Sequence, residues 1–317
     1  MCRIVVIGSS NTDLVAQVPR IPAPGETVSG GQFTIAGGGK GANQAVSAAR
    51  LGADVTFVAR IGDDLFGRRM LDALRQEALD LSYVAVDPEV ASGVALIVVD
   101  ASGENSIAVA PGANDRLSPA DVHRARSAVE SAQVVLLQLE APVETVRAAV
   151  ELAHAAGVRV ILNPAPAPPL GALDDILPQV DVLTPNEGEV EALAGTEGDV
   201  VAAARNLVAR GVPAVVVTLG AGGALIATGN DTIHVPAFSV EAVDTTGAGD
   251  AFSGGLAVAL AEGRSLAEAV RFGNACGALA ATRPGAQPSL PTAAEVQGFL
   301  DRRAVSGPTS DEERTTP

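Results

Sequence analysis

The sequence of 317 residues has few cysteines, few aromatic residues and little positive charge. Its two cysteines, Cys2 and Cys276, cannot form a disulfide framework, and each is interpreted as a small apolar residue. The formal net charge of −16 argues against non-specific binding to nucleic acid or to anionic membranes, because both need a basic surface. Hydrophobic residues make up 47% and charged residues 18%, which is typical of a folded globular protein.

The sequence also has no long hydrophobic run without breaks. Residues 211–230 carry no charge, but they contain five glycines and a proline and are predicted as strand, turn and strand, which disfavours a membrane span. The opening residues MCRIVVIGSSN indicate a strand and a turn instead of a signal peptide. We therefore expect a soluble cytoplasmic protein that binds neither nucleic acid nor a membrane.

Lysine is almost absent, since 20 of the 21 basic residues are arginine and the single lysine is Lys40 in GGGKGAN. An ammonium and a guanidinium are not interchangeable, so Lys40 is a candidate ligand-binding residue. The glycines around it would let the backbone approach a ligand closely. The alternative is a lysine placed by chance on a solvated loop.

Short runs rich in Val, Ile and Leu alternate with amphipathic segments along most of the chain. The predicted strands are 4–7, 55–59, 134–138, 158–162, 180–183 and 214–219. The predicted helices are 41–51, 65–78, 119–131, 143–156, 187–194, 199–210, 249–262, 265–282 and 292–303. This alternation indicates a mainly parallel sheet covered on both faces, with ligands at the carboxyl ends of the strands.

Two regions interrupt this alternation. Residues 13–36 have turn signals at PAPGE and SGG between extended segments, and residues 92–110 are predicted as a hairpin of ALIVVD and NSIAVA. Together they would form a small antiparallel sheet whose apolar face covers a ligand or a partner subunit. The alternative is that they add strands to the main sheet. The polar residues 304–317 are predicted to be a frayed tail.

The most informative motif is DTTGAGD, which runs from Asp244 to Asp250 and opens the predicted helix 249–262. The first turn of a helix has unpaired N–H groups and a partial positive charge, and glycines at 247 and 249 let a ligand approach, so the motif predicts an anion site. A carboxylate there would repel a phosphate. We therefore interpret Asp250 as a base that takes the proton of a hydroxyl, which then attacks the phosphate.

Polar residues also follow several predicted strands. Asn11 and Asp13 could hold neighbouring hydroxyls, or they could form an ordinary turn. Glu140 ends LLQLE, and Asn163 ends another strand. Asn186 and Glu189 are spaced to organise hydrated Mg²⁺ near phosphates, although charge complementarity at a helix start would be the favoured explanation of Glu189 if this motif stood alone.

The glycine-rich segments allow further interpretations. Residues 218–223 could line a pocket for a base or its phosphates, or form a tight turn. GGGKGAN is not a Walker A loop. It fits the dinucleotide-binding pattern GxGxxA loosely, but it does not follow a first strand, and this position disfavours a dinucleotide-dependent oxidoreductase. With Asn43 it suits a polyhydroxylated small molecule. Asn274 would face a nucleotide, and the loop after its helix could offer carbonyls to a monovalent cation beside Asp244.

Taken in order, these motifs resemble the ribokinase family of carbohydrate kinases over residues 3–303. The matching segments are GSSNTD, PAPGET, GGKGANQA, IGDDLFG, GVALI, GAN, LQLE, NPAPA, TPNE, TLGAGG, VDTTGAGDAF and TRPGAQPS. The resemblance implies a three-layer α/β/α fold with a mainly parallel central sheet and a small antiparallel β lid. It implies one kinase domain over residues 1–303, with lid segments at about 13–36 and 92–110 that form the interface of a homodimer.

The resemblance also implies ATP-dependent phosphorylation of the 5-hydroxyl of D-ribose, with Mg²⁺ and K⁺. Asp250 would be the base, and the backbone of Gly247, Ala248, Gly249 and Asp250 the anion hole. The sugar would be held by Asn11, Asp13, Gly39, Lys40, Gly41, Asn43, Glu140 and Asp250. ATP would contact Asn186, Thr218, Leu219, Gly220, Ala221, Gly222, Gly223, Gly249 and Asn274. Glu189 would organise Mg²⁺ through water, and K⁺ would lie at Asp244, Thr246, Ala280, Arg283, Gly285 and Ser289, partly on backbone carbonyls.

Two kinds of alternative stay open at this point. Kinases of the same family that act on deoxyribose, fructose, 2-keto-3-deoxygluconate or a nucleoside are close alternatives, because no residue reports directly how the 2-hydroxyl is sensed. A non-catalytic sugar-binding protein on the same scaffold is more distant, and the intact turn at Asp250 disfavours it.

Overall fold

A nine-stranded sheet forms the centre of residues 1–305, the part of the chain that the computed structural model describes. The predicted tail lies outside the described residues from position 306 to 317. Strands β11 to β5 pair in parallel, and β12 and β13 continue one edge in antiparallel pairing. The spatial order is β13 (Asp231–Val235), β12 (Ala224–Thr228), β11 (Ala214–Thr218), β10 (Val182–Leu183), β9 (Arg159–Asn163), β8 (Val134–Gln138), β1 (Arg3–Ile7), β4 (Asp54–Gly62) and β5 (Asp80–Asp87).

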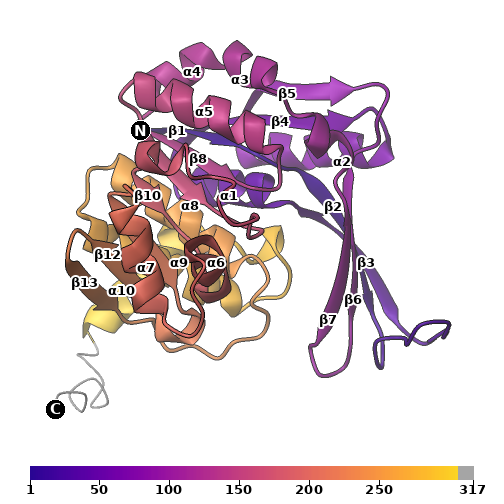
Figure 1. Cartoon of the computed structure of the whole chain (residues 1–317). Helices are drawn as coiled ribbons and strands as arrows, with labels where there is room; N and C mark the ends of the chain where they lie inside the picture. The colour runs from indigo at the N-terminus through magenta and orange to yellow at the C-terminus, as the bar shows by residue number, and fades with distance from the viewer. Residues whose placement is uncertain (306–317) are drawn as a thin grey trace.

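Helices cover both faces of this sheet, which confirms the predicted three-layer α/β/α fold (Figure 1). Along β1, Ile4 and Val6 pack into one buried cluster while Val5 and Ile7 pack into the other, as alternating side chains of a strand require. The first layer contains α1 (Lys40–Arg50), α2 (Leu65–Leu74), α8 (Ala248–Ala261), α9 (Leu266–Ala281) and α10 (Ala293–Val305). The second contains α3 (Pro119–Arg124), α4 (Arg126–Ser131), α5 (Val143–Ala155), α6 (Glu187–Ala194) and α7 (Val200–Ala209).

A separate four-stranded sheet projects from the body as an arm (Figure 1). Its order is β3 (Gln32–Gly38), β2 (Asn11–Gln17), β6 (Gly93–Val99) and β7 (Asn105–Ala110). Each of the two regions that interrupt the α/β alternation supplies an antiparallel pair, and β2 and β6 join the pairs in parallel. The two regions therefore build their own sheet and do not extend the main one.

Close packing of α1 against α8 brings the amino ends of these two helices to the same edge of the sheet. A Cβ atom added to Gly254 of α8 would lie 2.4 Å from the Ser47 hydroxyl oxygen of α1. On the neighbouring side, a Cβ at Gly255 would lie 2.7 Å from the Cys276 sulfur of α9. The two glycines therefore let α8 sit buried between α1 and α9.

The sequence did not predict every element. β5, at an edge of the sheet, mixes polar and apolar residues in its first half and lacks the dense Val/Ile/Leu content of the central strands. The predicted helix 119–131 divides at Ala125, and the predicted helix 65–78 ends as α2 at Leu74, followed by a 3₁₀ turn. None of the helices within residues 1–305 has the length and apolar character needed to cross a membrane.

Candidate active site

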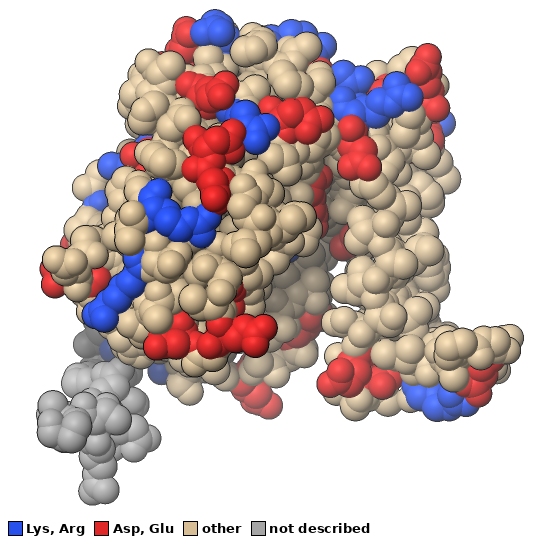
Figure 2. Space-filling view, viewed as in Figure 1, with Lys and Arg blue, Asp and Glu red and all other residues tan. Residues whose placement is uncertain are grey.

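Most of the residues predicted for the sugar and the reaction meet at the carboxyl ends of β1, β8 and β9, where the arm joins the body. The chain leaves β1 at Ile7 and enters the arm at Asn11, and Glu140 follows β8 by two residues. Helices α1 and α8 begin at the same edge. Figure 2 shows an open cleft between the body and the arm. On the face in this view, basic side chains are scattered among acidic ones and do not gather into a single basic patch.

Asp250 lies in the first turn of α8 and is only 8% exposed. Its carboxylate accepts hydrogen bonds from the side-chain amides of Asn43 at 2.9 Å and Gln44 at 3.0 Å. Burial raises the pKa of Asp250, while Lys40 and the two amides act in the opposite direction. The structure therefore places a carboxylate where it can be held in a fixed orientation and can accept a proton.

The start of α8 also presents backbone donors. Gly247 is the N-cap with a φ of 77°, a conformation that favours glycine, and the Ala248 N–H donates back to Thr245 O at 3.1 Å. Within residues 1–305, the N–H groups of Gly247, Gly249 and Asp250 have no acceptor. A Cβ at Gly249 would meet nothing within 4 Å, so nothing crowds this residue on that side, whereas a Cβ at Gly247 would lie 3.0 Å from the Ala286 Cα. Three of the four predicted anion-hole N–H groups are thus free for a ligand.

Glu140 connects the loop after β1 to the start of α1. Its Oε2 accepts hydrogen bonds from the Ser9 hydroxyl at 2.6 Å and from the Lys40 N–H at 2.9 Å. Ser9 in turn accepts the Gly41 N–H on its hydroxyl and the Ala42 N–H on its carbonyl. The first turn of α1, which follows Gly39 with a φ of 86°, is therefore capped by residues from two other strand ends.

The Lys40 side chain lies among carboxylates. Burial lowers the pKa of Lys40, but the charges of Asp250, Glu140 and Glu189 together raise it above the ordinary value. Lys40 is therefore a fixed positive charge between the predicted sugar residues and the predicted nucleotide residues. A compact ammonium at this position suits the neutralisation of phosphate charge.

Asn11 and Asp13 lie on the arm at the entrance to the site. Asn114, which the sequence analysis left without a role, donates to Asn11 Oδ1 at 2.7 Å and accepts the Ser10 N–H at 2.9 Å. Because its oxygen is already bonded, Asn11 keeps its amide hydrogens for a ligand. The pKa of Asp13 rises to about 7, first through burial and then through the charges of Glu140 and Asp250.

The predicted nucleotide residues form a neighbouring group around β10 and β11. Asn186 and Thr218 pair as an isolated bridge, and the 3₁₀ turn 220–222 that follows β11 is exposed. Each of Asn186 and Glu189 accepts the backbone N–H of the other on its side chain, at 2.8 and 2.9 Å, so Glu189 has a structural role at the start of α6. Burial raises the pKa of Glu189.

Asn274 on α9 is buried and holds the segment after β13. Its amide nitrogen donates to the carbonyls of Val235 and Pro236, both at 3.1 Å. With its two hydrogens used in this way, only the amide oxygen remains to accept a bond from a nucleotide.

The predicted potassium residues meet behind the anion-hole turn. Asp244 accepts the Thr246 N–H at 2.9 Å and the Gly285 N–H at 2.7 Å. Burial tends to raise the pKa of Asp244, but these hydrogen bonds lower it overall, so the group is ionised. Arg283 pairs with Glu295 instead, and within residues 1–305 no Lys or Arg side chain pairs with Asp244. A half-buried carboxylate without a counter-ion fits a cation site.

The other predicted potassium residues are less directly connected to Asp244. The Ala280 carbonyl accepts the Arg283 N–H at 3.1 Å, and the Ser289 hydroxyl donates to Ala286 O at 2.8 Å. Groups of three or more His, Cys, Asp or Glu side chains able to hold a metal are absent from the described part of the chain. A Mg²⁺ ion organised through water near Glu189 would take its direct ligands from water and phosphate oxygens, which Mg²⁺ prefers.

Three side-chain amides behind Asp250, two of them buried, were not assigned from the sequence. Gln44 contacts Asp250 directly, and Gln138 and Asn163 contact Gln44. Gln138 and Gln44 are completely buried. The signal for Gln44 and Gln138 was a polar residue inside an otherwise apolar helix or strand, which seldom occurs without a partner.

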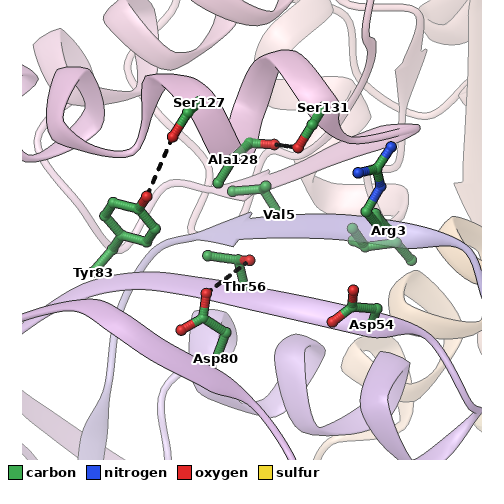
Figure 3. Close-up of a pocket in the computed structure, with 10 residues that line it drawn as sticks. Arg3, Val5, Asp54, Thr56, Asp80, Tyr83, Ser127, Ala128 and Ser131 are labelled. Carbon is green, nitrogen blue, oxygen red and sulfur yellow. Dashed lines mark hydrogen bonds between the residues drawn. The ribbon is translucent and has the colours of Figure 1, made fainter.

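A cavity of about 260 Å³ lies elsewhere, near the amino ends of β1, β4 and β5 (Figure 3). Asp80 and Thr56 are hydrogen-bonded at its floor, and Tyr83 reaches Ser127 of α4 across it. None of the residues predicted for substrate, nucleotide or metal lines it. Since parallel strands end at one edge of a sheet, this cavity is at the edge opposite to Asp250.

Comparisons with known proteins agree with this geometry. A family model described as pfkB family carbohydrate kinase matches residues 1–293. The ribokinase of Haemophilus influenzae is 43% identical over 302 residues, which cover 94% of this chain and 98% of the relative. The deoxyribokinase of Salmonella typhi is 41% identical with the same coverage. The structure of Arabidopsis thaliana ribokinase complexed with ribose and ATP has a TM-score of 0.86 and 34% identity, covering 95% of this chain and 99% of that one.

Proposed function

The chain belongs to the pfkB family of carbohydrate kinases, and from this premise we propose that it transfers the γ-phosphoryl group of ATP to the 5-hydroxyl of D-ribose. The observation that carries the proposal is the first turn of α8. There, a buried carboxylate held by two amides stands beside backbone N–H groups that have no acceptor within residues 1–305. A proton acceptor and an anion site are what phosphoryl transfer to a hydroxyl requires.

The proposed reaction uses residues on both sides of the transferred group. The 5-hydroxyl donates its proton to Asp250 as its oxygen attacks the γ-phosphorus, and the bond from that phosphorus to the bridging oxygen of ADP breaks. The N–H groups of Gly249 and Asp250 stabilise the charge on the phosphoryl oxygens, with Lys40 as the nearby cation. Asn11, Asp13 and the start of α1 would hold the remaining sugar hydroxyls.

The proposed nucleotide site runs from the start of α8 past Asn186 to the exposed turn after β11. Gly220 in this turn is fully open on its Cβ side, so a flat ring could lie against the backbone. Mg²⁺ would be organised through water near Glu189, where it would neutralise phosphate charge. K⁺ would lie beside Asp244, where it would fix the turn that leads to Gly247.

The test is a coupled ADP-release assay across ribose, 2-deoxyribose, fructose and adenosine, each with and without potassium. We expect ribose to give the highest kcat/KM and potassium to raise it. A clear preference for another sugar would refute the substrate assignment. Equal rates with and without potassium would refute the cation site while leaving the substrate assignment standing.

Deoxyribose is the second candidate substrate, because one relative of similar identity is a deoxyribokinase. We favour ribose because Asn11 and Asp13 offer both donors and an acceptor at the entrance to the site. A site built to bond a hydroxyl leaves polar groups unpaired when that hydroxyl is missing, so discrimination by a factor of about 10² or more is expected.

We further propose that residues 1–303 act as one kinase domain, with segments 13–36 and 92–110 as a lid and dimer interface. Support comes from side-chain alternation, since Leu14 pairs with Ile35 and with Leu96 on the face of the arm opposite to Asp13. Phe33 on the same face is 64% exposed. An apolar face of this kind indicates an interaction site.

Sedimentation of the parent chain and of Phe33→Asp tests the dimer. We expect a dimer for the parent and a monomer for the variant. Ile233→Asp is the matched control, because Ile233 is also an exposed large apolar residue on a strand, but on the far edge of the main sheet. A monomeric parent, or an equal effect of both variants, would contradict the interface.

A further inference from the structure

Gln44 lies directly behind the carboxylate of Asp250 and is completely buried. Its Nε2 donates to Asp250 Oδ1 at 3.0 Å and to Asn163 Oδ1 at 3.1 Å. Its Oε1 accepts a hydrogen bond from Gln138 Nε2 at 2.5 Å. Every polar atom of the Gln44 amide is therefore used, and none of these bonds goes to solvent.

The chemistry of the partners determines which group donates and which accepts in this chain of hydrogen bonds from Gln138 through Gln44 to Asp250. An ionised Asp250 can only accept, so Gln44 must present its amide nitrogen to it and its oxygen to Gln138. Gln138 must then donate, and among the described residues its own Oε1 has no hydrogen-bond partner. Asn163 is oriented from the other side, because its Nδ2 donates to the Thr184 carbonyl at 2.9 Å.

This chain of hydrogen bonds is anchored at the ends of two strands. Gln138 ends β8 and Asn163 ends β9, and the two are register partners in the parallel pair β8–β9. Gly8 makes room for the Gln138 amide, since a Cβ at that position would lie 2.0 Å from Gln138 Oε1 and would displace it. The motifs GANQA, LQLE and NPAPA, which lie far apart in the sequence, thus meet in one network at the back of Asp250.

The charged groups around Asp250 act in both directions on its ionisation. Lys40 from α1 favours the ionised carboxylate, whereas burial and Glu140 after β8 oppose it. Asp13 from the arm also interacts with Asp250, and Glu189 of α6 acts on Lys40. With acidic neighbours on two sides, the amide donors of Asn43 and Gln44 are needed to hold the base in its ionised form.

We propose that Gln44 is a positioning residue for the base: it fixes the orientation of the Asp250 carboxylate and keeps it ionised, and Gln138 fixes the orientation of Gln44. This inference rests on the proposed phosphoryl transfer, in which Asp250 accepts the proton. Gln44 does not reach the substrate, because it contacts the inner side of the carboxylate through Oδ1 while Asn43 holds Oδ2.

The first test is the pH dependence of kcat/KM for ribose in Gln44→Met, which keeps the length of the side chain and removes the donor. Losing one hydrogen bond to a charged group should move the acid limb upward by about one to two pH units. At pH values above this acid limb, the activity of Gln44→Met should return toward that of the parent. A fold defect would lower activity at all pH values, so recovery at high pH separates positioning from structure.

The second test changes Gln138, which contacts Gln44 but not Asp250. Gln138→Met removes the donor to Gln44 Oε1 without touching Asp250, and we expect a smaller upward shift of the same limb. Ser47→Ala is the matched control, because Ser47 is also completely buried on α1 but faces α8 one turn further along. We expect no movement of the limb in this control.

A third measurement does not depend on turnover. In protein labelled with ¹³C at aspartate carboxyls, the Asp250 signal is identified by its loss in Asp250→Asn and titrated in the parent and in Gln44→Met. A higher carboxyl pKa in Gln44→Met supports the inference even if ribose is not the substrate, whereas failure of the ribose assay in the parent overturns only the proposed function. An unmoved carboxyl pKa, or a Ser47→Ala shift as large as that of Gln44→Met, overturns the inference.

Discussion

Asp13 should make the stability of the ligand-free protein depend on pH in a way that Asp13→Asn removes. Its pKa in the folded protein is about 7 against an ordinary value of 3.8, because the site buries it beside two other carboxylates. A group with a raised folded pKa contributes stability that is present below the unfolded pKa and is lost as the pH rises through the folded pKa. The loss from Asp13 therefore falls between pH 3.8 and about 7.

The size of the effect follows from the two pKa values. At 1.36 kcal/mol for each pKa unit, the full penalty is about 4 kcal/mol, of which about 2.6 kcal/mol develops between about pH 5 and about pH 8. With an unfolding entropy of about 2.1 cal/mol/K for each residue, this corresponds to about 4 °C in Tm. Asp13→Asn carries no charge at any of these pH values and escapes the penalty.

The assay is thermal unfolding of the parent and of Asp13→Asn, without ligand, across this pH range. We expect the Tm of the variant minus that of the parent to increase by about 4 °C from about pH 5 to about pH 8. A Tm difference that stays constant with pH would refute the argument that Asp13 is buried among carboxylates. Calorimetry on the same proteins should show weaker ribose binding in Asp13→Asn, because the variant replaces one of the two acceptor oxygens of the carboxylate with a donor.

Three further substitutions test other parts of the site. Asp250→Asn should lower kcat by about 10²–10⁴-fold while calorimetry shows ribose binding close to that of the parent; near-parental turnover would exclude Asp250 as the base. Lys40→Met should move the acid limb of the kcat pH profile to higher pH, because Lys40 favours the ionised form of Asp250. Lys40→Arg should return this limb to its position in the parent. An acid limb at the same pH in all three proteins would contradict this role of Lys40. Gly8→Ala should displace Gln138 and lower the free energy of unfolding, measured with denaturant, by about 1–3 kcal/mol. It should also move the acid limb of the kcat pH profile to higher pH. Unchanged stability would show that Gln138 can move freely.

The sequence predicted the parts of the fold that depend on local pattern. Strands such as β1 and β8 are dense in branched apolar residues, and their alternation with amphipathic helices indicates a parallel sheet with helices on both faces. Edge strand β5 escaped prediction because its residues are mostly only partly buried and it begins and ends with polar residues, so it lacks the long apolar run of a central strand. The division of helix 119–131 at Ala125 has no comparable signal in the sequence.

For the site, the sequence predicted residues whose type is unusual in its local setting. A carboxylate at the glycine-rich start of α8 and one lysine among arginines are visible without a structure. Gln44, Gln138 and Asn114 act through partners that lie about a hundred residues away, so their roles depend on the packing of β1, β8 and α1. Such contacts are tertiary, and no local pattern specifies them.

The most direct test of the account is a competition between equal amounts of ribose and 2-deoxyribose for limiting ATP, with the phosphorylated products separated by mass. We expect ribose 5-phosphate as the main product from the parent chain and a loss of both products in Asp250→Asn. Deoxyribose 5-phosphate as the main product would contradict the substrate assignment, and undiminished product from Asp250→Asn would contradict the mechanism.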